Sequence, residues 1–92
     1  HILPKKGVYC VNVILEGKIY RGIANFGERP TVKGLNLLLE THLFEFNSNI
    51  YGKQLTVEFL TFIRPEKKYK DFKILSNQIQ KDVKKAKKYH KI

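Results

Sequence analysis

The sequence lacks several residue types, and each absence narrows its possible structure. Its 92 residues include no Met, no Trp and one cysteine, Cys10. A single thiol excludes an internal disulfide framework or a zinc site of several cysteines, and it favours a reducing, cytoplasmic compartment. No apolar run approaches the roughly 18 residues of a membrane span, and no signal-peptide pattern opens the chain. Because the chain starts at His1 without a Met, we interpret it as a piece of a longer protein.

Acidic residues are also scarce, with 8 Asp and Glu against 18 Lys and Arg, for a net charge of +10. The excess is uneven, because residues 66–92 hold ten lysines and only three acids. The basic character is therefore mostly one lysine-rich segment, as is typical of a solvated helix surface. With 42% hydrophobic residues, five Tyr and six Phe, the chain can fill the core of one small domain.

The first two-thirds of the chain show the alternation of β-strands. We predict strands over about 8–63, at 8–15, 18–25, 37–46 and 54–63, with a tight hairpin turn at Glu16-Gly17. The breakers Gly27, Pro30 and Gly34 predict that residues 26–36 form a loop.

The period changes after Pro65. A helix over about 71–90, with Asp71 as N-cap, is predicted by an apolar stripe at spacings of three and four: Phe72, Leu75, Ile79, Val83 and Ala86. Strands followed by one helix indicate a mainly β domain, in which the helix packs on the sheet. A small barrel would remove exposed edges, although four strands rarely close one, and a preceding segment could supply more.

The strongest candidate for chemistry is Glu40-Thr41-His42. Alternate residues of a strand share a face, so Glu40 and His42 point the same way as three apolar side chains, Leu38, Phe44 and Phe46. A carboxylate on such a face suits a general base. The alternative is a strand at the rim of the sheet, with Glu40 and His42 simply wet.

Two further segments combine polar groups. Residues 25–31, beginning with Asn25, carry an amide, a glycine, an arginine and a hydroxyl, which fit either a ligand loop or an ordinary wide turn. Residues 64–69 carry charges and an aromatic ring, which fit either a flap over a pocket or a simple lead-in to the helix. Phosphate-loop motifs are absent, and the three histidines are too scattered for a metal site. Cys10 lies in an apolar strand and is expected in the core.

Several phrases, in order, carry a resemblance to a known family: L-P-K-K-G-V-Y at 3–9, Y-R-G-I-A-N-F-G-E-R-P-T at 20–31, E-T-H-L-F-E-F at 40–46, I-Y-G-K at 50–53, V-E-F-L-T-F-I-R-P-E at 57–66 and Q-I-Q-K-D at 78–82. Together they cover about 80 residues. On these phrases the chain resembles the riboflavin kinase domain of bacterial bifunctional riboflavin kinase/FAD synthetases.

The resemblance implies a six-stranded Greek-key barrel, incomplete here, with a C-terminal helix. It implies transfer of the ATP γ-phosphoryl group to riboflavin, which gives FMN, with Mg²⁺ neutralising charge. Glu40 matches the acid of the family's E-x-H motif and would be the general base. The resemblance also suggests groups that bind the two substrates. For the flavin these are Arg64, Glu66, Tyr69 and Asn25, and for the nucleotide they are Tyr51 and His42.

One departure from the family is important. The family's P-T-A-N motif, whose Thr and Asn bind metal and phosphates, does not occur in these 92 residues. We therefore expect the metal ligands, and an N-terminal adenylyltransferase domain, in a part of the parent protein that precedes His1. We also expect residues 1–92 alone to be nearly inactive as a kinase. Riboflavin, FMN, ATP and ADP are the expected partners, without a membrane.

A different class remains open, namely a small basic β-barrel that binds nucleic acid through stacking aromatics. The candidate stacking residues are Tyr9, Tyr20, Phe26 and Tyr51. The lysines gather on the predicted helix and not on the strands, which argues against this alternative. An affinity that collapses with salt would support it.

Overall fold

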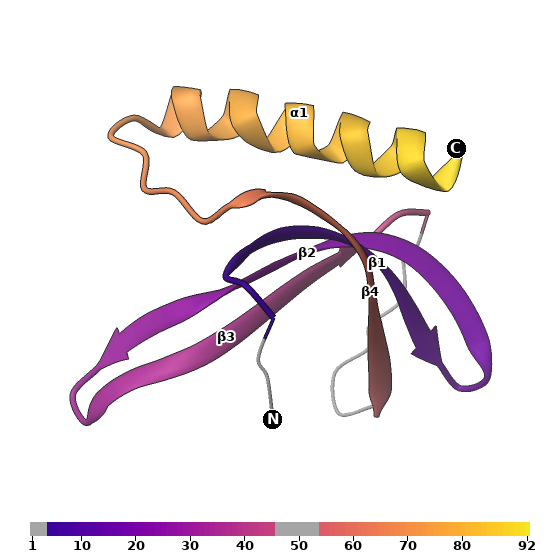
Figure 1. Cartoon of the computed structure of the whole chain (residues 1–92), viewed down its shortest axis with the longest axis horizontal. Helices are drawn as coiled ribbons and strands as arrows, with labels where there is room; N and C mark the ends of the chain where they lie inside the picture. The colour runs from indigo at the N-terminus through magenta and orange to yellow at the C-terminus, as the bar shows by residue number, and fades with distance from the viewer. Residues whose placement is uncertain (1–3, 46–53) are drawn as a thin grey trace.

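A computed structural model describes residues 4–45 and 54–92. The described residues form four strands and one helix: β1 (Gly7–Leu15), β2 (Lys18–Thr31), β3 (Gly34–Leu43), β4 (Leu55–Pro65) and α1 (Phe72–His90). All strand pairs are antiparallel, in the order β3-β2-β1-β4, and α1 lies across one side of the strongly twisted sheet (Figure 1). β3 and β4 do not pair within the described residues, so these strands form an unclosed, partial barrel. The prediction of a mainly β domain with a C-terminal helix is confirmed.

The β1–β2 hairpin forms where the sequence predicted it. Leu15 pairs with Lys18, which leaves Glu16 and Gly17 as a two-residue loop. Both loop residues have positive φ angles, 52° and 80°, as a type I′ turn requires. This turn twists in the same sense as the strands it joins and so fixes their register.

The loop predicted at residues 26–36 is wrong. β2 continues through Pro30 to Thr31, and β3 starts at Gly34 after a tight turn in which the Thr31 hydroxyl donates to the Gly34 carbonyl at 3.1 Å. β1 begins only at Gly7, which pairs with Phe26. Residues 27–31 and 34–38 therefore form a two-stranded extension of the sheet beyond β1. We call this extension the outer ribbon. Among the described residues, this part of β2 has a neighbouring strand on one side only, so Pro30 is tolerated there.

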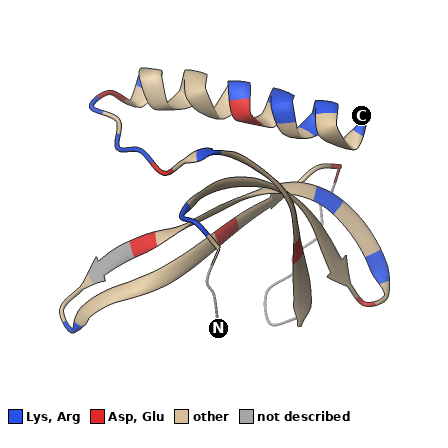
Figure 2. Ribbon diagram, in the orientation of Figure 1, with Lys and Arg blue, Asp and Glu red and all other residues tan. Residues whose placement is uncertain are grey.

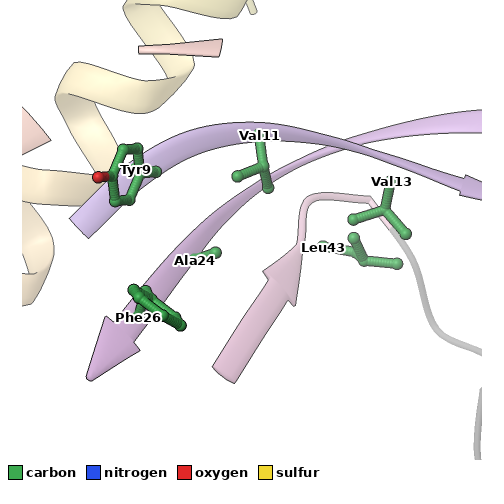
Figure 3. Packing of buried hydrophobic residues seen from close by; sticks show 6 residues of the cluster. All are labelled: Tyr9, Val11, Val13, Ala24, Phe26 and Leu43. Atoms are coloured by element: carbon green, nitrogen blue, oxygen red, sulfur yellow. The ribbon is translucent and has the colours of Figure 1, made fainter. Parts of the chain in front are cut away.

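The main apolar core lies on the face of the sheet away from the helix (Figure 3). Its buried members come from the three adjacent strands: Tyr9, Val11, Val13, Ala24, Phe26 and Leu43. Tyr9 and Phe26 are each only 8% exposed, so the suggestion that they stack on nucleic-acid bases is wrong. Tyr9 stacks instead on Phe59 of β4, with ring centroids 4.7 Å apart.

A second cluster lies between the sheet and the helix. Cys10, Phe44 and Ala86 form its buried centre, and the Cys10 thiol lies 3.7 Å from the Ala86 carbonyl oxygen. The prediction of a core thiol is confirmed, and burial raises the pKa of Cys10 above the ordinary thiol value. This cluster attaches the C-terminal half of α1 to the sheet.

The helix begins at the predicted cap, where the Asp71 carboxylate accepts a hydrogen bond from the Lys73 amide at 2.7 Å. Figure 2 shows its lysines concentrated toward the C-terminal half, where the helix dipole favours cations. The predicted apolar stripe is only partly covered: Ala86 is buried, whereas Phe72 is 82% exposed, contrary to expectation. Among the described residues, the helix side chains that pack on the sheet lie in its C-terminal half, at Val83, Ala86 and His90. Within the same residues, no helix has the length and the apolar composition needed to cross a membrane.

Candidate functional site

A pocket of about 490 Å³ opens between α1 and the sheet face that it covers. One part of its lining is apolar, from two strands and the helix: Val8, Ile23, Leu75, Ile79 and Val83. The other part is polar, from β2, β3, β4 and the helix: Asn25, Glu40, His42, Arg64 and Asp82. This volume and this mixed lining are typical of sites that bind small molecules.

Strand register brings two of the predicted site residues together. Asn25 pairs directly with Glu40, and Ile23 pairs with His42, so all four side chains share the face that α1 covers. The face alternation read from the sequence therefore holds for Glu40 and His42. Glu40 and His42 are also exposed to solvent, which agrees with the alternative interpretation that the strand lies at the rim of the sheet. Both interpretations therefore hold in part, because Glu40 and His42 are solvent-exposed and also line the pocket.

Arg64 reaches the pocket wall from the end of β4, but its side chain is already engaged. Its Nε donates to both carboxylate oxygens of Asp82, at 3.0 and 2.9 Å, and a terminal nitrogen lies 2.8 Å from Oδ2. Gln78 donates to the same carboxylate at 2.9 Å. The Asp82 side chain is only 3% exposed, against 18% for that of Arg64. This pair links β4 to α1 beside the pocket.

The segment after β4 folds back over Arg64. The Arg64 guanidinium lies 5.7 Å from the centre of the Tyr69 ring, and the Lys67 ammonium lies 5.6 Å from it. Tyr69 is half-buried. Such cation–π contacts give the segment a preferred position. The assignment of Arg64 and Tyr69 to flavin binding stays a prediction.

Glu66 does not line the pocket in this structure. Its carboxylate rests against Gly27 of β2, in space that a Cβ at residue 27 would fill. A larger residue at position 27 would displace the Glu66 carboxylate, which is the end of an exposed side chain, from this position. The Asn25–Thr31 segment thus contributes to the site region as a strand, with Asn25 on the pocket and Gly27 beneath Glu66.

An aromatic chain lies next to Glu40. The His42 ring meets Phe44 edge-on at 5.9 Å, and Phe44 meets His90 of α1 in the same way at 6.1 Å. His90 Nε2 also lies 3.3 Å from the Gly22 carbonyl oxygen. These contacts hold His42 in the wall. Tyr51, the other predicted nucleotide contact, lies outside the described residues.

Sequence reasoning missed Asp82 and Gln78 as members of the site region. A signal was present, because Asp82 is the single acid of a lysine-rich helix and lies three residues after Ile79, on the apolar stripe. An acid at such a position needs a basic partner. Within residues 4–45 and 54–92, no three His, Cys, Asp or Glu side chains converge as metal ligands.

A mainly β domain with an amphipathic pocket under one helix has the features of a small-molecule-binding domain. Comparison with known families is more specific: the family model described as Flavokinase, riboflavin kinase, matches residues 1–90. The chain belongs to the riboflavin kinase family.

Curated relatives carry the name bifunctional riboflavin kinase/FMN adenylyltransferase. The chain is 54% identical to that of Haemophilus influenzae, over 91% of this chain and 28% of that protein. It is 36% identical to that of Bacillus subtilis, over 97% of this chain and 29% of that protein. For Escherichia coli K12 the identity is 39%, over 88% and 26%. The chain therefore spans between a quarter and a third of the length of these relatives.

A solved structure described as a macrolide-efflux protein from Streptococcus pneumoniae is similar in fold. The TM-score is 0.79 at 33% identity, over 88% of this chain and 27% of that chain. This similarity supports the arrangement of strands and helix. The description as an efflux protein applies to that structure and is not transferred to this chain.

Proposed function

We propose that this domain transfers the γ-phosphoryl group of ATP to the terminal ribityl hydroxyl of riboflavin, giving FMN and ADP. The observation that carries the proposal is the position of Glu40. In a chain of the riboflavin kinase family, its carboxylate lies on the wall of a pocket to which the helix contributes mostly apolar side chains. The apolar side suits a flat, largely hydrophobic ring, and the polar side suits a sugar-like chain.

In the proposed mechanism, Glu40 accepts the proton of the riboflavin hydroxyl as its oxygen forms a bond to the γ-phosphorus. The bond from that phosphorus to the bridging oxygen of ADP breaks, and the electron pair leaves with ADP. The proton on Glu40 then passes to water. Asn25, paired with Glu40 across the strands, can hold the ribityl chain in line for this attack. Phosphoryl transfer depends mainly on such positioning and on neutralised charge.

ATP is the co-substrate of this proposal, and Mg²⁺ would supply charge neutralisation when bound. Among the described residues, no three His, Cys, Asp or Glu side chains are grouped as metal ligands. We therefore assign its ligands to a P-T-A-N segment outside these residues and derive no step through the metal. His42 and Tyr51 remain the candidates for contact with the nucleotide.

The proposal includes the setting of the domain. Residues 1–92 would form the riboflavin kinase domain of a bifunctional cytoplasmic enzyme, next to an adenylyltransferase domain that converts FMN to FAD. The bifunctional names of the relatives support the second activity. The buried, unpaired thiol of Cys10 is compatible with a reducing compartment.

The decisive experiment is Glu40→Gln in the natural polypeptide that contains these residues. FMN formation should fall by roughly 10²–10⁴-fold, the contribution of a general base, while riboflavin affinity changes little because the amide keeps the shape. Glu58→Gln is the matched control, since Glu58 is exposed on β4 and bonds Asn12 outside the pocket. A near-normal rate for Glu40→Gln would assign the base to another residue.

A riboflavin titration of residues 1–92, followed by flavin fluorescence, tests the substrate independently of turnover. We expect saturable binding that tolerates salt. Enhancement by Mg-ADP, or robust FMN formation by these residues alone, would contradict the expectation that the phosphate and metal groups lie elsewhere. Absence of flavin binding to the natural polypeptide would refute the proposed function.

A further inference from the structure

We propose that Asp82 is a positioning residue for the flavin side of the pocket, acting through Arg64 and Tyr69. Asp82 would fix the orientation of the Arg64 guanidinium, and the guanidinium would in turn hold the segment of residues 66–70 beside the pocket. This inference rests on the proposed function for its ligand, although the link between the three residues can be tested without it.

The burial of Asp82 is the first argument. A carboxylate that is 3% exposed must be fully paired, because an isolated buried charge is very costly. Both of its oxygens accept from Arg64, and Gln78 donates to one of them from the preceding helical turn. Arg64 is thereby held by a bidentate contact, which restricts a guanidinium far more than a single hydrogen bond.

The second argument is that the pair forms part of the pocket wall. Arg64 and Asp82 both line the pocket. A guanidinium has five N–H donors. Contacts with the described residues engage Nε–H, one N–H toward Asp82 and one from Nη1 to the Pro65 carbonyl at 3.1 Å. The other two donors have no recorded acceptor among residues 4–45 and 54–92, and Asp82 balances the charge of the group. Such a wall suits neutral carbonyl acceptors, such as those of an isoalloxazine ring.

The third argument is the connection to the segment after β4. The Arg64 guanidinium carbon lies 5.7 Å from the centre of the Tyr69 ring, so the ring packs against a cation that Asp82 immobilises. Without Asp82 the guanidinium can rotate toward water, and Tyr69 loses its fixed partner. Residues 66–70 have no regular secondary structure. The Glu66 amide donates to the Lys6 carbonyl at 3.4 Å at the start of this segment, and the Arg64–Tyr69 contact restrains it further along.

Limited trypsin digestion tests the link directly. Lys67, Lys68 and Lys70 lie in the segment, and cleavage after each can be followed by mass spectrometry. Asp82→Asn and Tyr69→Ala should each speed the initial cleavage there several-fold, at a temperature where both variants are fully folded. Glu58→Gln should leave it unchanged. Unchanged cleavage in both variants would overturn the proposal. Should Asp82→Asn fail to fold, Tyr69→Ala and Arg64→Lys, which keeps the charge but loses the bidentate contact, decide the matter.

Kinetics of the natural polypeptide test the consequence for the ligand. Asp82→Asn should raise the KM for riboflavin roughly tenfold or more, as expected for a misplaced binding group, with the KM for ATP within about twofold of normal. The double variant with Tyr69→Ala should be no worse than the more affected single variant, because both act through one path. An Asp82→Asn variant that melts earlier but keeps its riboflavin KM would show a merely structural pair. A wild-type polypeptide that makes no FMN would instead refute the proposed function, and the trypsin result would still decide the link.

Discussion

The four-stranded part of the sheet and the outer ribbon contrast sharply, although both are rich in apolar residues. On one face of β3, the exposed fraction rises along alternate leucines: 7% at Leu43, 39% at Leu39, 50% at Leu37 and 65% at Leu35. β1 and β4 continue the sheet beyond β2 at the level of Leu43, but they do not reach the level of Leu35. The burial of an apolar side chain on this strand is therefore set by the strands around it.

Charged pairs show the same contrast. Arg64 and Asp82 are enclosed between β4 and α1, whereas Lys6 pairs with Glu28 of the outer ribbon at side-chain exposures of 44% and 31%. An enclosed pair depends on both partners, because removal of one leaves an unpaired charge. An exposed pair is surrounded by water, which replaces either partner at little cost.

The largest expected effect on stability follows from this contrast. Asp82→Ala should lower the free energy of unfolding by about 3–5 kcal/mol, because it leaves the largely buried Arg64 guanidinium without its counter-charge. Glu28→Ala, which breaks the exposed pair, should cost about 0–1 kcal/mol. Urea denaturation followed by circular dichroism measures both. Equal losses would mean that the two regions are equally enclosed.

A matched pair of leucines sharpens the comparison within one strand. Leu43→Ala should cost about 2–5 kcal/mol, through lost burial and a cavity in the core. Leu37→Ala removes the same atoms from a half-exposed position on the same face and should cost less than about 1 kcal/mol. The same denaturation experiment compares them. A large loss at Leu37 would indicate that something covers the outer ribbon in solution.

The helix start gives a smaller effect. Asp71→Ala removes the acceptor of the Lys73 amide and should cost about 1 kcal/mol. Asp71→Asn, which keeps a capping oxygen, is the control and should lose much less. If both variants lose the same amount, the carboxylate charge stabilises the helix and the cap does not.

The smallest effect concerns the thiol in the four-stranded part. Burial raises the pKa of Cys10, so the folded state keeps its proton at pH values where the unfolded thiol has lost it. Stability should therefore fall as pH rises above the pKa of the unfolded thiol. A comparison of the pH dependence of unfolding with that of Cys10→Ala isolates this contribution. An identical pH dependence would show that the native environment does not disfavour the thiolate.

Local signals in the sequence predicted much of the fold. The turn at Glu16-Gly17 was predictable because glycine readily adopts the positive φ angle that this turn needs. The helix start was predictable because the Asp71 side chain offers an oxygen that accepts from a backbone amide. The alternation of β3 correctly placed Glu40 and His42 on one face. The outer ribbon was missed because Gly27, Pro30 and Gly34 usually interrupt strands, and only the position of the neighbouring strands shows that Pro30 is harmless at an edge.

By itself, the sequence determined most of the secondary structure, the family and the face of β3 that carries Glu40 and His42, because these depend on neighbouring residues and on ordered motifs. The tertiary structure decided which residues share the pocket. Three contacts near the pocket join residues that are distant in the chain. Asn25 pairs with Glu40, the Glu66 carboxylate lies against Gly27, and Asp82 forms an enclosed ion pair with Arg64. Their positions depend on strand register and on where the helix packs, which no local pattern encodes.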